Sequence, residues 1–252
     1  MQNKIKSERG MRMSTEKNSS TAQSAVYYAL KKNIMSLQLK PGTAMSTQEI
    51  SAKLNVSRTP VREAFIRLQR DGLVDIFPQK ETIVSRIDFS KVKQERFIRE
   101  SLECQNIDLL MGNFTKHDLR EMEMNIEKQK SAIRTGDQNA HIVLDNEFHR
   151  YMFTLTGQEL SWQVIESTSN HYARVRLLSV NDETVMRETV LQHQEILSAI
   201  YNQDAKHAKL CIKNHLHRLE GQLQQILTNY PEYFKQTQIP DEERFAALLA
   251  EK

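Results

Sequence analysis

Apolar residues recur every three to four positions along most of the chain, which is the spacing of one buried face of an α-helix. An early run of this kind spans Ala22 to Leu37. Beyond residue 89 the pattern is nearly continuous, with Gly, Asp or Asn at the joints where helices end and begin. It predicts helices at about residues 89–113, 116–135, 138–156, 159–180, 184–203 and 205–229. Short loops between them favour an all-α antiparallel bundle of six to seven helices. The apolar run Phe245–Leu249 in the tail can dock as a last helix or fray.

Two shorter helices joined by a tight turn are predicted between Ser46 and Leu73. In the first, Ile50 and Leu54 are four residues apart and can be buried on one face. In the second, Ser57 can cap the N-terminus, and Pro60 falls in the first turn, where its missing N–H costs nothing. The segment is therefore a compact helical pair.

Cationic and hydroxyl side chains cluster at the start of the second short helix. Arg58, Thr59 and Arg62 lie off its apolar stripe. A recognition helix presents such groups to guanine edges and phosphates in the major groove of DNA. The same residues also fit a solvated cationic face on an ordinary helical hairpin.

The amino-acid sequence of this segment resembles a known DNA-binding module. Residues 54–74, LNVSRTPVREAFIRLQRDGLV, resemble the winged helix-turn-helix of GntR-family bacterial repressors, whose hallmark is S-R-T-P-V-R-E-A followed by Gly-Leu. The resemblance implies a DNA-binding domain over residues 21–88. Residues 1–20 are polar, Ser/Lys-rich and unpatterned, so we expect a disordered leader there, with a cationic arm that tracks DNA as the alternative. It implies DNA contacts by Arg58, Thr59 and Arg62, with Ser57 beside them and Gln48 near the backbone or groove edge.

Two strand-like runs, Leu73–Phe77 and Thr82–Ser85, follow this pair and predict a hairpin, which in this family is the wing. Relatives usually carry Arg-Gly at its tip, whereas this chain has Lys80-Glu81. Without glycine the backbone takes a positive φ less readily, and a carboxylate is repelled by phosphates. We therefore expect a shallow wing contact, with Gln79 and Lys80 as its candidates.

Charge is unevenly distributed along the 252 residues. Through Asp88 there are 15 Lys and Arg against 8 Asp and Glu, while the remainder has 20 against 24. A basic N-terminal module on an acidic body fits phosphate binding by the first part. A chance imbalance on a solvated surface would give the same counts.

Membrane and secreted classes are disfavoured. No apolar stretch approaches a membrane span, and the N-terminus lacks the apolar core of a secretory signal. Two cysteines, Cys104 and Cys211, are too few for a disulfide framework. We expect a cytoplasmic protein with no membrane partner.

A candidate metal site lies beyond Asp88, in the part of the chain that holds all eight histidines. Asp145 and His149 are four residues apart and project from the same helix face; His193 and His215 lie on later helices. One carboxylate and three imidazoles inside a bundle would suit a divalent transition metal with one or two open positions. The spacing alone also fits surface or core histidines.

The residues around these histidines resemble the effector domain of the FadR subfamily within the GntR group, often called FCD. The resemblance rests on D-x-x-x-H at residues 145–149, on the H-x-x-I-x-x-A-I run from His193, on His215-Leu216, and on an R-x-x-L-E start at residues 99–103. It implies an all-helical effector domain over residues 89–230 before a tail, residues 231–252. It also implies metal ligation by Asp145, His149, His193 and His215, with zinc first and nickel or manganese as alternatives.

In such domains the open metal positions take the carboxylate of a small organic acid. Arg99, Asn170 and Arg174 can line that pocket, because a guanidinium suits a second carboxylate. Ion pairs or solvated helix faces explain the same three residues equally well. Sugar acids, hydroxy acids and short dicarboxylates all fit as effectors.

The resemblance therefore implies a DNA-binding transcriptional regulator that is not an enzyme, and a repressor is the preferred interpretation. It would bind double-stranded operator DNA as a homodimer, with a small carboxylic acid modulating its affinity. Two other interpretations stay open: a metal-dependent enzyme, although no H-E-x-x-H is present, and a helical scaffold with a degenerate DNA-binding module.

Overall fold

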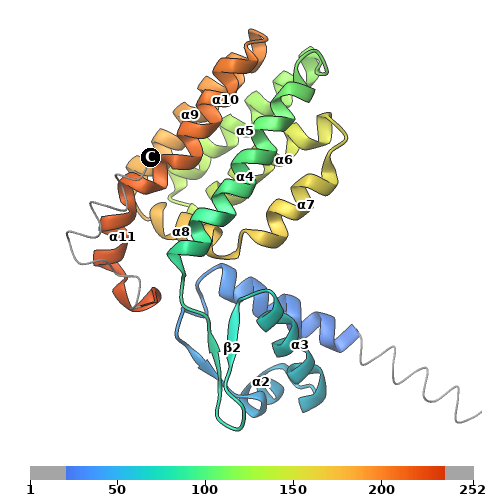
Figure 1. Cartoon of the computed structure of the whole chain (residues 1–252), viewed down its shortest axis with the longest axis vertical. Coiled ribbons are helices and arrows are strands. Elements are labelled where there is room, and N and C mark those ends of the chain that lie inside the picture. The colour runs from blue at the N-terminus through green and yellow to red at the C-terminus, as the bar shows by residue number, and fades with distance from the viewer. Residues whose placement is uncertain (1–20, 236–252) are drawn as a thin grey trace, which may run out of the picture. The chain divides into compact units, whose positions relative to one another are not determined.

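The computed structural model describes residues 21–235, which form two compact units that divide between Arg86 and Ile87 (Figure 1). The chain is mostly helical, as predicted. Among the helices of the described part, none is long and apolar enough to cross a membrane. The predicted leader, residues 1–20, and the apolar run Phe245–Leu249 lie outside the described residues.

The first unit is a helical domain with a small sheet. Residues 21–35 are helical, and they are followed by β1 (Ala44–Met45), α2 (Thr47–Leu54), α3 (Arg58–Arg70), β2 (Val74–Ile76) and β3 (Thr82–Val84). The sheet is antiparallel in the order β1-β3-β2, with Ala44 opposite Ile83 and Val74 opposite Val84. The winged helix-turn-helix prediction is confirmed, except that the two-residue strand β1 is too short to leave a sequence pattern.

The turn between α2 and α3 depends on local capping. The Ser46 hydroxyl accepts the Glu49 N–H at 3.0 Å to start α2, and Asn55 ends it in the left-handed region at φ 51°. Ser57 occupies the N-cap position of α3, but its hydroxyl makes no capping hydrogen bond to the helix. The predicted side-chain cap is therefore wrong, because the extended backbone of Ser57 starts α3 without it.

The core of this unit is built from the predicted apolar stripes. Val61, Phe65 and Leu68 of α3 are almost fully buried, together with Ile50 of α2. Leu54 is 40% exposed, so the expectation that it would be buried with Ile50 is wrong. Leu54 is the last residue of the eight-residue α2, where the helix has already left the core.

The second unit is a helical bundle. Its elements are α4 (Phe89–Leu110), α5 (Lys116–Thr135), α6 (Gln138–Leu155), α7 (Glu159–Thr168), α8 (Asn170–Ser179), α9 (Glu183–Tyr201), α10 (Ala205–His217), the 3-10 turn η1 (Arg218–Gln222), α11 (Leu223–Asn229) and the 3-10 turn η2 (Pro231–Tyr233). Long antiparallel helices pack side by side, most extensively α5 with α6 and α9, and α10 with α4 and α9.

Two of the predicted helices are interrupted. The run predicted at 159–180 breaks at Ser169 into α7 and α8, where the Ser167 and Thr168 hydroxyls bond back to the Val164 carbonyl. The run predicted at 205–229 tightens into η1 around Gly221 before α11. Apolar periodicity continues through both breaks, so it could not show them.

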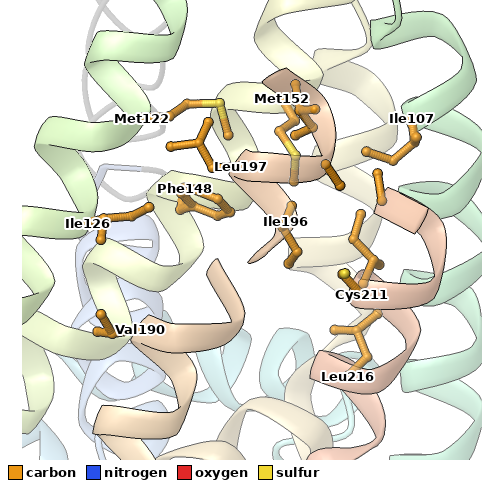
Figure 2. Close-up of a cluster of buried hydrophobic side chains, with 14 of the residues drawn as sticks. Ile107, Met122, Ile126, Phe148, Met152, Val190, Ile196, Leu197, Cys211 and Leu216 are labelled. Carbon is orange, nitrogen blue, oxygen red and sulfur yellow. The ribbon is translucent and has the colours of Figure 1, made fainter. Parts of the chain in front are cut away.

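The bundle core fills the space between α4, α5, α6, α9 and α10 with interlocking apolar side chains. Figure 2 shows Phe148 and Met152 of α6 facing Ile196 and Leu197 of α9, with Met122 of α5 beside them. Burial of these side chains, each worth roughly 1.5–3 kcal/mol, holds the histidine-bearing helices in fixed register.

Candidate metal centre and DNA-reading helix

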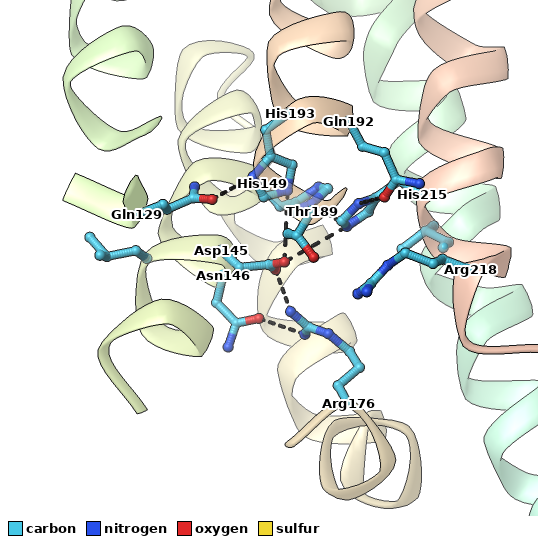
Figure 3. A network of polar contacts seen from close by, with 12 residues as sticks. Gln129, Asp145, Asn146, His149, Arg176, Thr189, Gln192, His193, His215 and Arg218 are labelled. Carbon is cyan, nitrogen blue, oxygen red and sulfur yellow. Dashed lines mark hydrogen bonds and ion pairs between the residues drawn. The ribbon is translucent and has the colours of Figure 1, made fainter. Parts of the chain in front are cut away.

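Four predicted ligands meet at one buried point of the bundle. Asp145 and His149 come from α6, His193 from α9 and His215 from α10. Each is at most 5% exposed, and one potential ligand atom from each lies within 4.8 Å of all the others (Figure 3). The structure thus brings together residues that are 70 positions apart in the sequence.

The side-chain atoms that face one another at this point are imidazole nitrogens and a carboxylate oxygen, which are all potential metal ligands. The Nε2 atoms of His193 and His215 lie 3.7 and 3.8 Å from Oδ1 of Asp145, and Nε2 of His149 lies 3.2 Å from Nε2 of His215. The buried Nε2 of His193 has no hydrogen-bond partner. Inward lone pairs with no donor between them are costly unless a cation satisfies them.

Each imidazole is oriented from behind by an oxygen atom. Nδ1 of His149 lies 2.7 Å from Oε2 of Glu103, Nδ1 of His193 lies 2.9 Å from Oε1 of Gln129, and Nδ1 of His215 lies 3.0 Å from Oε1 of Gln192. Because a carboxylate or amide oxygen only accepts, each Nδ1 carries the proton and each Nε2 presents a lone pair inward. Metal-binding histidines are commonly held in this way.

Electrostatics favour the same protonation states. Burial lowers the pKa of His193 and of His215 well below the usual value, so both rings are neutral at pH 7. Burial works against ionisation of Asp145, but the guanidinium of Arg176, which pairs with Oδ2, outweighs it and holds the pKa well below its usual value. The centre therefore offers the anionic oxygen of Asp145 and the neutral rings of His193 and His215, beside the imidazole of His149, a donor set that fits a divalent transition metal.

Sequence reasoning missed the groups that support the ligands: Glu103, Gln129, Arg176 and Gln192. One of them left a signal. Gln129 continues the apolar stripe of α5 after Met122 and Ile126 and is fully buried. A polar residue in the middle of a buried stripe needs a partner, which here is His193.

The three predicted effector residues are buried but are placed differently. Nε of Arg99 donates to Oε1 of Glu103 at 2.5 Å, and its Nη2 lies 4.0 Å from Oδ2 of Asp145, so Arg99 borders the centre. Nε of Arg174 instead donates to the Asn170 carbonyl at 3.2 Å, within α8. The α8 residue that pairs with Asp145 is Arg176.

The start of α3 presents the predicted DNA-contacting residues to solvent. Arg58, Thr59 and Arg62 are exposed, as are Ser57 before them and Gln48 on α2. The first turn of α3 holds no acidic residue. Since Val61 and Phe65 on its opposite face are buried, the cationic end of α3 is fixed by the core and free on its outer side.

The wing takes a conformation that its sequence disfavours. The Lys80 N–H donates to the Phe77 carbonyl at 3.1 Å, and Gln79 has φ 61°. With Pro78 before it, this is a type II turn, whose third position normally requires glycine. The wing tip therefore takes a positive φ without glycine, although this conformation is less favourable for glutamine. Gln79 and Lys80 are both exposed at the tip.

Comparison with known proteins identifies the family. Residues 22–84 match the model of bacterial regulatory proteins of the gntR family, and residues 96–218 match the FCD domain. The chain is 30% identical over 211 residues to the HTH-type transcriptional repressor RspR of Escherichia coli (strain K12), covering 84% of this chain and 92% of RspR. The chain belongs to the GntR family.

Other GntR-family proteins share the sequence pattern and the fold. The HTH-type transcriptional regulator McbR of Escherichia coli (strain K12) is 25% identical over 180 residues, covering 69% of this chain and 80% of McbR. The solved structures of E. coli McbR/YncC and of a putative GntR regulator from Rhodococcus sp. RHA1 each superpose with a TM-score of 0.67 at 22% identity. Each comparison covers 83% of this chain, with 98% of the first structure and 99% of the second. This GntR-family chain is thus a DNA-binding transcriptional regulator with an FCD domain.

Proposed function

We propose that this GntR-family regulator is a cytoplasmic repressor of the FadR subfamily. It binds operator DNA as a homodimer, and a small carboxylic acid held at the Asp145 centre with a divalent transition metal changes its operator affinity. The observation that carries the proposal is the donor set, in which three imidazole Nε2 atoms and one carboxylate oxygen converge while an oxygen orients each imidazole from behind.

The donor set indicates which metals fit. Three nitrogens and one oxygen suit zinc first, and nickel or manganese also accept this combination. Asp145, His149, His193 and His215 would hold the ion, and the bound ion would supply open coordination positions for an acid's carboxylate. Arg99, beside the centre, is positioned to favour an acid that carries a second anionic or hydroxyl group.

DNA reading is assigned to the exposed end of α3. Arg58 and Arg62 would supply donors to base edges, and Thr59 and Ser57 would contact phosphates. Gln48 on α2 and Gln79 and Lys80 at the wing tip would add backbone contacts. In a homodimer, two such helices about one DNA turn apart would read the two halves of a pseudo-palindromic operator.

The test combines metal analysis with DNA binding. The purified protein should contain close to one transition-metal ion per chain, and it should retard DNA from its own promoter region more strongly than random DNA. A thermal-shift screen of carboxylic acids should give acid-induced stabilisation that depends on the metal.

Two variants make the assignment falsifiable. His149→Ala and His193→Ala should each lose the metal and the acid response. The control His117→Ala alters an exposed histidine at the start of α5 and should keep both. Unchanged metal content in His149→Ala and His193→Ala would refute the site, and measurable turnover of an acid would favour a metalloenzyme instead.

A further inference from the structure

A short C-terminal segment returns to the start of the second unit. We call residues 223–235 the strap; they comprise α11, η2 and the next two residues, and they lie beyond the last residue that matches the FCD domain. Phe234 forms a parallel bridge with Ile87. The Ile87 N–H donates to the Tyr233 carbonyl at 2.8 Å, and the Lys235 N–H donates to the Ile87 carbonyl at 3.1 Å.

Side chains reinforce this bridge. The rings of Phe234 and Phe89 stack with centroids 4.8 Å apart, and both Phe234 and Ile87 are fully buried. Nζ of Lys235 lies 3.1 Å from Oδ2 of Asp88. The strap thus holds residues 87–89, which follow directly after Arg86, the last residue of the DNA-binding unit.

Asp88, one of these three residues, also contacts the first turn of α8, and the opposite end of α8 reaches the candidate metal centre. The Asp88 N–H donates to Nδ1 of His171 at 3.2 Å, in the first turn of α8. Near the opposite end of this ten-residue helix, Arg176 pairs with Asp145. One rigid helix therefore connects the candidate metal ligand Asp145 to Asp88 at the junction.

A second connection runs along the chain from His215. Two residues after this candidate ligand, α10 ends and the chain tightens into η1, a change that often marks a hinge. Nη1 of Arg218, the first residue of η1, donates to the Val185 carbonyl at 3.1 Å. Figure 3 shows Arg218 beside His215, with its guanidinium directed toward the centre.

The strap is incompletely packed against the bundle. A cavity of about 370 Å³ lies between the strap, η1 and the α8–α9 connection, with Leu178, Val185, Gln222 and Ile226 among its lining residues. At its rim, the Asn181 side chain donates to the Tyr230 hydroxyl at 2.8 Å. Figure 1 shows α11 beside α8. Because the cavity leaves one side of the strap without packing partners, the strap can shift at a lower cost than a helix of the core.

We propose that the strap couples the Asp145 centre to the DNA-binding unit. The inference rests on the proposed metal site. If His215 and Asp145 held an ion, η1 and α8 would be more ordered, and the strap and His171 would hold residues 87–89 more tightly. Residues 87–89 would then restrict the DNA-binding unit that precedes them and change the population of its orientations that can engage an operator.

Hydrogen exchange of the full-length protein tests this coupling, with zinc alone as the probe. Zinc-loaded and chelator-stripped wild type should differ at least threefold in exchange rate for peptides covering residues 84–92 and 228–235, with the loaded form slower. Peptides containing His149 and His193 should also slow. In Phe234→Ala the centre should still respond to zinc, while residues 84–92 should exchange fast in both states.

DNA binding provides the second measurement. The operator dissociation constants of loaded and stripped wild type should differ at least fivefold, and in Phe234→Ala by less than twofold. If Phe234→Ala does not fold, Phe234→Leu replaces it in both measurements, because it keeps an apolar side chain but removes the stacked ring. Phe97→Ala, which removes an aromatic ring that is 69% exposed on α4, is the matched control and should behave as wild type.

The outcomes separate the two proposals. If zinc slows exchange at His149 and His193 but leaves residues 84–92 unchanged, or if Phe234→Ala keeps the full zinc effect on operator affinity, the coupling is overturned and the metal site stands. If zinc slows neither region, both are overturned.

Discussion

Oε1 of Gln129 lies 2.9 Å from Nδ1 of His193, although the two residues are 64 positions apart. Gln129 is fully buried on α5 and His193 fully buried on α9. The amide oxygen accepts the Nδ1 proton, so that Nε2 faces Asp145 as a lone pair. This contact ties the chemistry of the candidate metal centre to the packing of α5 against α9.

Replacing this amide should weaken metal binding without removing a ligand. Gln129→Leu keeps the volume but leaves the Nδ1 proton without an acceptor, and we expect zinc affinity to fall about 10- to 100-fold. Titration against a competing chelator measures it. Gln194→Leu alters the exposed residue next to His193 and should keep wild-type affinity. Equal affinities for the two variants would contradict the orienting role.

Loss of Arg58 should reduce sequence discrimination. We expect Arg58→Ala to weaken binding to the cognate operator by about 1–3 kcal/mol, with a smaller loss on random DNA. Fluorescence anisotropy with both duplexes measures the difference. Arg70→Ala, at the exposed far end of α3, is the control and should change both affinities little. An equal loss on the two duplexes would show that Arg58 contacts only phosphate.

The wing tip should become more stable with glycine. Gln79 holds φ 61°, a region that costs an ordinary residue about 1–2 kcal/mol. Gln79→Gly relieves this cost but adds flexibility to the unfolded chain, so we expect a net stabilisation of about 0.5–1 kcal/mol. The same substitution at Gln69, exposed within α3, should destabilise by about 1 kcal/mol. Urea unfolding measures the change in the free energy of unfolding for both variants. If Gln79→Gly destabilised the protein as Gln69→Gly does, there would be no strain at Gln79.

Stability should depend on pH through Glu95. Burial raises the pKa of Glu95 to about 7, although its carboxylate accepts the backbone N–H groups of Tyr172 and His171. Because the unfolded state releases this proton near pH 4.5, the folded state binds more protons between these values. The contribution of Glu95 to stability is therefore lost as pH rises from about 4.5 to 7.

The variant Glu95→Gln removes this titration while keeping an oxygen for the two N–H groups. Relative to wild type, its free energy of unfolding should rise by about 3 kcal/mol between pH 4 and pH 8, from the width of the pKa shift. Urea unfolding of the metal-stripped proteins measures it. Glu166→Gln, exposed on α7, should keep the wild-type pH dependence. Parallel curves for Glu95→Gln and wild type would show that Glu95 is ionised throughout.

Local patterns in the sequence were sufficient to predict most of the helices, the presence of a wing hairpin and the family. The apolar period of α5, α6 and α9 follows directly from which side chains leave water, so it can be read without knowing the partner helix. Asp145 and His149 share a face because helix geometry alone places residues four apart together. The exposed cations at the start of α3 could be predicted for the same reason, since Val61 and Phe65 fix which face is buried.

The tertiary structure alone decided which distant groups meet. Gln129 behind His193, Arg176 on Asp145, and Phe234 on Ile87 join residues far apart in the chain. No local spacing encodes such pairs, because they depend on the order and register in which helices pack. The start of α8 after the break at Ser169 also depends on packing, since Glu95 on α4 accepts the backbone N–H groups of His171 and Tyr172. The sequence alone determined which faces of the helical runs are buried and which residues are candidates for binding metal and DNA; helix packing decided which side chains orient the candidate ligands.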